Sequence, residues 1–208
     1  AIISEREDGL KSKISTLELK DKVLKMAGWL KENGISKGDR VCAYMPNCPE
    51  TIITMLATAS LGAVFSSCST DFGVAGVLDR FQQIEPKILV TVDGYLYNGK
   101  AIERHEEVHQ IVQGLNTLQN VLILKYLNEN HLKYSFFYKD FDSVYRSKPL
   151  EKFIRVNFND PLYIVFSSGT TGAPKCIVHG VGGVLLQHAK EHKLCLLYTS
   201  PSPRDSMT

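Results

Sequence analysis

Short apolar runs alternate along this chain with longer segments that have the periodicity of amphipathic helices. Apolar runs of this length are typical of strands, and the longer segments are typical of helices that cover a sheet. Strands that are separated by helices usually become parallel neighbours joined by right-handed crossovers. The pattern predicts an α/β fold of layered sheets with flanking helices. The expected strands are 39–45, 63–65, 87–92, 120–126 and 162–166, with a short one at 176–178, and the expected helices are 15–33, 49–61, 74–84, 101–113 and 183–193.

Local signals define several ends of these helices. Ser15 begins a capping box, and Gly34 stands where a helix C-terminus is expected. Pro49 suits a first helical turn, whereas Pro86 would stop the preceding helix. The residues before Ser15 are polar and carry no such signal. The segment 128–159 also lacks a clear period and is expected to be irregular.

The composition is that of an ordinary folded protein. The 208 residues are long enough to bury a core as one domain. The net charge of +2 comes from scattered residues without a basic stripe, so nucleic acid is not an expected partner. The longest apolar stretch, 51–65, is too short and too interrupted by Thr, Ser and Gly to span a membrane. Five cysteines without paired or metal-ligand spacing favour reduced thiols and a cytoplasmic, cytosolic location.

The segment most informative about function is YIVFSSGTTGAPK, residues 163–175. A buried-strand pattern ends there in a loop of hydroxyls and glycines that closes on a lysine. Gly169 and Gly172 permit backbone angles that let N–H groups approach an anion. Lys175 adds a compact positive charge. Hydroxyl donors come from Ser167, Ser168, Thr170 and Thr171. The segment therefore predicts a loop that binds polyphosphate.

Two other interpretations of this loop have to be weighed. The Walker A loop has its Lys directly after the last Gly, whereas Ala173 and Pro174 intervene here, so this would be a different phosphate loop. GTTG by itself is more typical of a Ser/Gly-rich surface turn. The full string, from the apolar strand to Lys175, favours the phosphate loop.

In its order of Tyr, apolar strand, SSGTTG, Pro and Lys, the full string resembles the signature of the adenylate-forming superfamily, which includes acyl-CoA synthetases, luciferases and peptide synthetase adenylation domains. Residues 71–87 (DFGVAGVLDRFQQIEPK), 97–100 (YNGK) and 166–192 are similar to the acetoacetate-CoA ligases of that superfamily. The resemblance implies that residues 1–193 are part of a large N-terminal AMP-binding (adenylation) domain. Residues 194–208, rich in Ser and Pro, are expected to be a non-native or disordered tail.

The resemblance also implies a reaction. Acetoacetate would attack the α-phosphate of Mg-ATP to give acetoacetyl-adenylate, and the thiol of coenzyme A would then displace AMP, providing activated acetoacetate for lipid synthesis. The expected cofactors and substrates are therefore ATP, Mg, coenzyme A and acetoacetate. The residues expected to bind the nucleotide phosphates are Ser167, Ser168, Gly169, Thr170, Thr171, Gly172 and Lys175, with Pro174 shaping the turn.

Other parts of the machinery of this superfamily are expected to lie beyond this chain. They are the catalytic lysine, the acidic motif for Mg and the adenine-binding region. We therefore expect no catalytic residue and no metal ligand within the 208 residues, and a chain that is inactive by itself. Two alternatives stay open: a ligase for acetate, propionate or another short acid, and a truncated isoform that binds nucleotide without turnover. The sequence predicts no oligomeric state.

Several shorter motifs have plainer explanations. Asp71 begins a DFG triplet, but the other motifs of protein kinases do not accompany it, and we expect Asp71 to cap the next helix. GVGG at 180–183 lacks the third glycine of a dinucleotide fingerprint and suits the start of a helix. His188 and His192 lie four residues apart without an evident third metal ligand. Cys176, beside Lys175, has no base placed next to it and is assigned no chemistry.

Overall fold

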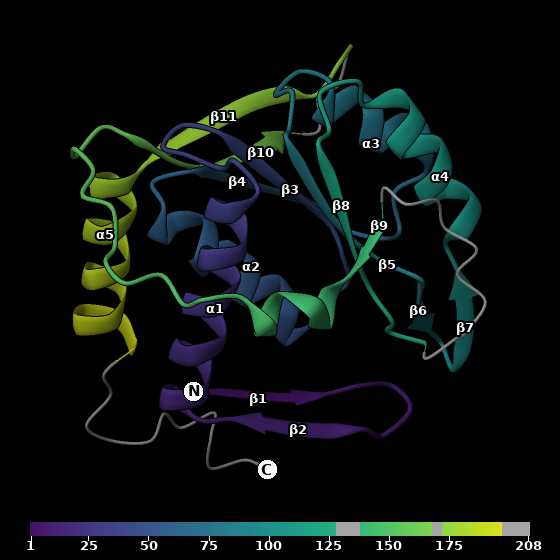
Figure 1. Ribbon diagram of the computed structural model, residues 1–208, viewed down its shortest axis with the longest axis horizontal. Coiled ribbons are helices and arrows are strands. Elements are labelled where there is room, and N and C mark those ends of the chain that lie inside the picture. The colour runs from purple at the N-terminus through teal and green to yellow at the C-terminus, as the bar shows by residue number, and fades with distance from the viewer. Residues whose placement is uncertain (128–137, 168–171, 197–208) are drawn as a thin grey trace.

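A seven-stranded sheet forms the centre of the computed structural model, which describes residues 1–127, 138–167 and 172–196 (Figure 1). The strand order is β11-β10-β4-β3-β5-β8-β9. Every neighbouring pair is parallel except β10 and β11, which are antiparallel. The α/β expectation is confirmed. The strands are β3 (Arg40–Tyr44), β4 (Val64–Cys68), β5 (Ile88–Val92), β8 (Asn120–Leu124), β9 (Tyr138–Asp140), β10 (Pro161–Ser167) and β11 (Lys175–Gly180).

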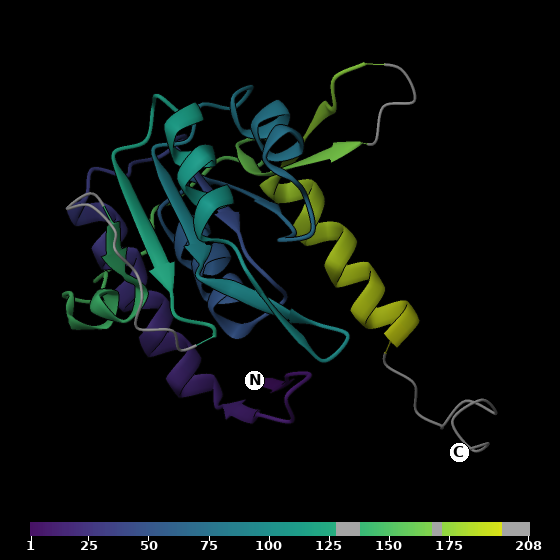
Figure 2. The same cartoon turned by 90° about the vertical axis from the view of Figure 1, so that its right-hand side faces the viewer.

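Helices cover both faces of this sheet. One face packs against α1 (Thr16–Glu32), α2 (Pro49–Ser60) and the 3-10 helix η1 (Phe141–Arg146), and the other against α3 (Val74–Phe81) and α4 (His105–Gly114). The helix α5 (Val181–Lys190) follows β11 and continues into a π-helical turn, η2 (Glu191–Leu196). Figure 2 shows α5 running away from the sheet. Among the described residues, we find no helix with the length and apolar character that crossing a membrane requires.

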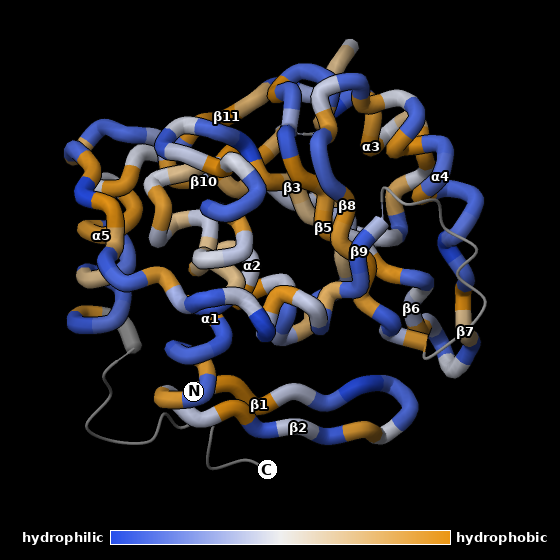
Figure 3. The backbone as a smooth tube through the Cα atoms, in the orientation of Figure 1, coloured by the Kyte–Doolittle hydropathy of each residue, from blue (hydrophilic) through white to orange (hydrophobic). Residues whose placement is uncertain are grey.

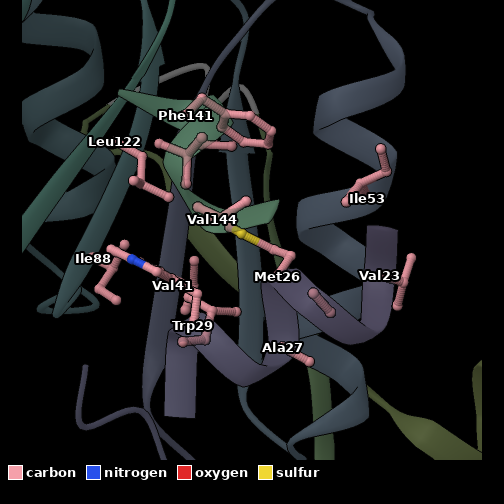
Figure 4. Packing of buried hydrophobic residues seen from close by; sticks show 14 of the residues in the cluster. Val23, Met26, Ala27, Trp29, Val41, Ile53, Ile88, Leu122, Phe141 and Val144 are labelled. Carbon is pink, nitrogen blue, oxygen red and sulfur yellow. The ribbon is translucent and has the colours of Figure 1, made fainter. Parts of the chain in front are cut away.

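The two helical layers enclose two hydrophobic cores. Because side chains alternate along a strand, Val41 of β3 faces the α1 and α2 side, whereas Cys42 faces α3 and α4. Met26 and Ile53 bring the helices into the first core, where η1 also contributes side chains (Figure 4). All five residues of β5 are buried, as expected for a parallel strand covered on both faces. Figure 3 shows the hydrophobic segments gathered along the central strands.

Several expected elements are confirmed, with shifted ends. The hydroxyl of Ser15 accepts a hydrogen bond of 3.1 Å from the Glu18 N–H, so Ser15 caps α1 as its capping box predicts. Pro49 begins α2. The expected strand at 63–65 extends to Cys68, and α5 begins at Val181, two residues earlier than expected.

Two short hairpins correct the sequence analysis. The expected helix at 101–113 begins only at His105, because residues 100–103 form strand β7 (Lys100–Glu103), which pairs with β6 (Gly94–Tyr97). Asn98 and Gly99 turn this hairpin with positive φ angles of 50° and 72°. An Asn-Gly pair strongly favours such a turn. A second hairpin, β1 (Ile2–Glu5) with β2 (Lys11–Ile14), occupies the segment before α1 for which the sequence analysis assigned no strands.

Two further expectations were wrong, the second of them only in part. Asp71 does not cap α3: the N-cap residue is Gly73, and the Asp71 carboxylate accepts a hydrogen bond of 2.9 Å from the Ser69 hydroxyl. The segment 128–159 is not irregular throughout, since it contains β9 and η1. Phe141 and Val144 of η1 are fully buried. Tertiary burial therefore forms η1 where the local sequence has no clear period.

Gly28 lets the chain cross α1 closely. A Cβ atom at Gly28 would overlap the carbonyl oxygen of Lys148, which is backbone and cannot swing aside. Two residues further on, the Leu150 N–H donates a hydrogen bond of 2.8 Å to the Leu24 carbonyl of α1. The absence of a side chain at Gly28 thus allows the segment around Lys148 to seal the outer face of the first core.

We predict that Gly28→Ala lowers the free energy of unfolding by about 1 to 3 kcal/mol, the usual cost of overpacking. Urea denaturation followed by circular dichroism measures this change. Gly183→Ala is the matched control, because a Cβ there meets no atom within 4 Å. The free energy of unfolding of the control should rise by up to about 1 kcal/mol, because alanine has a higher helix propensity than glycine. A stabilised Gly28→Ala protein would contradict the close crossing.

Candidate functional site

The predicted phosphate loop connects β10 and β11 at one end of the sheet. Its first strand pairs with β4 only at Tyr163 and Ile164. The buried Ser66 hydroxyl strengthens this junction by donating a hydrogen bond of 2.8 Å to the Ile164 carbonyl. Beyond Ile164 the two strands of the hairpin pair only with each other, and Figure 2 shows the end of β10 and the start of β11 projecting from the sheet. The loop therefore lies at the carboxyl end of β10, where parallel α/β sheets usually bind ligands.

Ser167 and Lys175 lie directly opposite each other at the base of the loop. Ser167 is the last residue of β10, and Lys175 is the first of β11. Directly opposite residues on paired strands place their side chains on the same face. The fold thus brings together a hydroxyl and an ammonium group that are eight positions apart. Ser168, Gly169, Thr170 and Thr171, which were expected to complete the site, lie outside the described residues.

The closing side of the loop depends on Gly172. Its φ angle is +109°, a conformation that residues with a side chain rarely adopt. A Cβ at Gly172 would meet no atom within 4 Å, so the glycine is required for its backbone angle rather than for space. Pro174, whose own φ is restricted by its ring, then leads into β11. The two residues direct the chain back so that Lys175 meets Ser167.

Helix α3 contacts both strands of the hairpin. The guanidinium of Arg80 lies 4.4 Å from the ring centroid of Phe72 and 6.0 Å from that of Phe166 on β10. The side-chain amide of Gln83, just after α3, donates a hydrogen bond of 3.0 Å to the Pro174 carbonyl. Arg80 and Gln83 are not predicted from the sequence, because nothing in the local pattern indicates that α3 lies beside residues more than eighty positions later.

A second group of polar side chains holds the loop after β4. The Tyr44 hydroxyl lies 3.0 Å from the Thr70 carbonyl oxygen and 2.8 Å from that of Phe72, and donates its proton to this pair of acceptors. Arg104 Nε donates a hydrogen bond of 3.1 Å to the same Thr70 carbonyl. Burial raises the pKa of Tyr44 to about 12, although the charge of Arg104 opposes this shift. These contacts fix the segment that ends at Phe72, which in turn stacks on Arg80.

The described part of the site is suited to an anion. Lys175 is cationic, Ser167 on the same face is a hydroxyl donor, and Gly172 exposes backbone. Over residues 1–127, 138–167 and 172–196, no group of three or more His, Cys, Asp or Glu side chains is arranged to hold a metal ion. His188 and His192 are both exposed. Burial raises the pKa of Cys68 to about 11, which disfavours a reactive thiolate there.

Known proteins resemble this chain over most of its length. A family model described as AMP-binding enzyme matches residues 2–206. Acetoacetyl-coenzyme A synthetase of Rhizobium meliloti (strain 1021) is 46% identical over 198 residues, which are 93% of this chain and 30% of that protein. Acetoacetyl-CoA synthetase of Macaca fascicularis is 44% identical over 190 residues, covering 88% of this chain and 28% of the relative.

A solved structure gives the same result in three dimensions. Acetoacetyl-CoA synthetase from Streptomyces lividans superposes with a TM-score of 0.86 at 37% sequence identity. The superposition covers 91% of this chain and 29% of that chain. The present chain therefore spans less than a third of the length of these relatives.

We predict that Tyr44→Phe lowers the free energy of unfolding by about 1 to 3 kcal/mol at neutral pH, because the Phe72 and Thr70 carbonyls lose the Tyr44 donor and Arg104 still reaches only Thr70. The folded state raises the pKa of Tyr44 from 10.0 to about 12, so the neutral phenol stabilises the fold. This contribution is complete below pH 10 and disappears as the pH rises through about 12. The variant should therefore lose part of the alkaline decline in stability. Tyr97→Phe, at an exposed position, is the control.

Proposed function

The chain belongs to the AMP-binding enzyme family, and we propose that it provides the phosphate-binding part of an acetoacetate-CoA ligase. The relatives named acetoacetyl-CoA synthetase, at 44% and 46% identity, support the choice of acetoacetate as the acid and coenzyme A as the thiol. In this proposal residues 1–193 are part of the AMP-binding domain of a cytosolic ligase that supplies acetoacetyl-CoA to lipid metabolism. ATP and coenzyme A are its other substrates.

One observation carries the proposed role in phosphate binding: Lys175 and Ser167 face the same side of a projecting hairpin at the carboxyl end of β10. The positive φ angle of Gly172 beside them suits a loop whose backbone N–H groups turn toward an anion. The proposed phosphate ligands are Ser167, Ser168, Gly169, Thr170, Thr171, Gly172 and Lys175, with Pro174 shaping the turn. Residues 168–171 lie outside the described residues.

The chemistry explains why such a loop is needed. A carboxylate oxygen of acetoacetate attacks the α-phosphate of ATP, the bond from that phosphate to the bridging oxygen breaks, and pyrophosphate leaves with additional negative charge. Donors that already point at the β- and γ-phosphates stabilise that charge without further reorganisation. They also hold the α-phosphate in line for attack. The coenzyme A thiol then attacks the acyl carbon and releases AMP, with its proton passing to water or a base.

Magnesium enters this proposal with the nucleotide. Mg²⁺ is bound in many sites by substrate phosphates with one or two carboxylates rather than by an all-protein cage. The ion would neutralise charge on the ATP phosphates beside Lys175. In this proposal the described residues supply ammonium and hydroxyl groups to the nucleotide, and the phosphate oxygens of ATP would be the ligands of the ion.

We predict that Lys175→Ala weakens the binding of inorganic pyrophosphate by about 10- to 100-fold, because a hydrogen bond to a charged group contributes about 1.5 to 3 kcal/mol. Titration calorimetry of the 208-residue chain measures the dissociation constant. Lys13→Ala removes an exposed lysine from β2, remote in sequence from the hairpin, and is the matched control. Equal affinity of the Lys175→Ala and native proteins would remove Lys175 from the site.

We also predict that the 208-residue chain by itself binds ATP without releasing AMP when acetoacetate, Mg²⁺ and coenzyme A are added. The proposed ligands reach only the phosphates, and a loop that binds phosphates cannot by itself orient the acyl carboxylate and the nucleoside. Coupled detection of AMP provides the measurement. AMP release that depends on acetoacetate would overturn this prediction, and a preference for acetate or propionate would change the substrate while retaining the reaction class.

A further inference from the structure

We propose that Gln83 is a positioning residue for Lys175, acting from the turn just after helix α3 on the backbone at the start of β11. The inference rests on the proposed role of Lys175 in phosphate binding, which it deepens. Gln83 does not contact the bound phosphates in this scheme. It holds the backbone on both sides of Lys175, which fixes the position of the Lys175 Cα and limits where the ammonium group can lie.

The side-chain amide of Gln83 contacts the residues immediately before and after Lys175. Its nitrogen donates to the Pro174 carbonyl at 3.0 Å, and its oxygen accepts from the Cys176 thiol at 3.4 Å. The same nitrogen also donates to the Asp79 carbonyl of α3 at 2.5 Å, which fixes the amide to the helix. One planar group therefore links α3 to the two positions of the hairpin that flank Lys175.

Strand geometry places these contacts of Gln83 on the face of β11 opposite to the Lys175 side chain. Successive side chains on a strand point to opposite faces. Because the Cys176 thiol points toward Gln83, the Lys175 side chain leaves β11 on the other face, which it shares with Ser167. Gln83 thus contacts the hairpin on the face that carries Cys176. The opposite face, with Ser167 and Lys175, stays open to a phosphate.

The hairpin needs such support because the sheet does not provide it. Pairing of β10 with β4 ends at Ile164, three residues before Ser167, so the tip has no strand partner outside the hairpin among the described residues. Arg80, between Phe72 and Phe166, supports the first strand of the hairpin, and Gln83 supports the second. A loop that is ordered before binding loses less entropy when the ligand binds, and so binds more tightly.

Gln82 provides a matched control at the preceding position. Its side-chain nitrogen also donates a hydrogen bond of 3.0 Å to a backbone carbonyl, but the acceptor is Gly114 at the end of α4. Gln82 and Gln83 are both exposed, so replacement by leucine should leave the protein folded in either case. If Gln83 only stabilised helix α3, the two variants should bind pyrophosphate with the same affinity.

The test compares Gln83→Leu with Gln82→Leu in the 208-residue chain, using inorganic pyrophosphate and titration calorimetry. Gln83→Leu should weaken binding by about 3- to 10-fold, the effect expected when one ordinary hydrogen bond is lost. Gln82→Leu should change it by less than 2-fold. Thermal unfolding of both variants should be similar, which separates positioning of the loop from general stability.

A double-mutant cycle with Lys175→Ala shows whether Gln83 acts through the lysine. If it does, Gln83→Leu should have no further effect once Lys175 is alanine. Equal fold losses in both backgrounds, or equal losses for the two glutamine variants, would overturn the positioning role. Unchanged pyrophosphate binding in Lys175→Ala alone would instead reject the proposed phosphate site, so the two failures are distinguishable.

Discussion

The burial of the central parallel strands on both faces is the constraint on which the rest of the structure depends. Every residue of β5 is buried, and β3 places alternate side chains in two separate cores. Such strands are stable only if helices cover each face, which places α1 and α2 on one side and α3 and α4 on the other. Both faces are then occupied by packing, so the ends of the strands are the places where polar groups can gather.

Helix α3 connects this packing to the candidate site. Val77 and Phe81 are fully buried against the sheet, so the helix cannot shift without opening the second core. The polar residues Arg80 and Gln83, next to these anchors, contact the two strands of the β10–β11 hairpin. A rigid element thereby supports the two strands of the hairpin beyond their pairing with β4. The same hydrophobic burial that stabilises the fold therefore holds the helix whose neighbouring side chains contact both sides of Lys175.

A second set of contacts extends this support to the loop after β4. Tyr44 and Arg104 bind the carbonyl of Thr70, and Phe72 stacks on Arg80. The loop after β4 therefore contacts Tyr44 and Arg104 through its Thr70 carbonyl, and contacts helix α3 through the Phe72 ring. The cost of burying the Tyr44 hydroxyl is offset because it faces two backbone acceptors.

The sequence by itself determined the α/β class, most strands and helices, and the place of the predicted phosphate loop, because apolar period, caps and glycines act over a few residues. It indicated Ser167, Gly172 and Lys175, which the structure brings together, while Ser168 to Thr171 stay predictions. Only the tertiary structure decided that η1 forms and that Gln83 and Arg80 support the hairpin. Those contacts join residues far apart in sequence, and their stability comes from packing that no local pattern encodes.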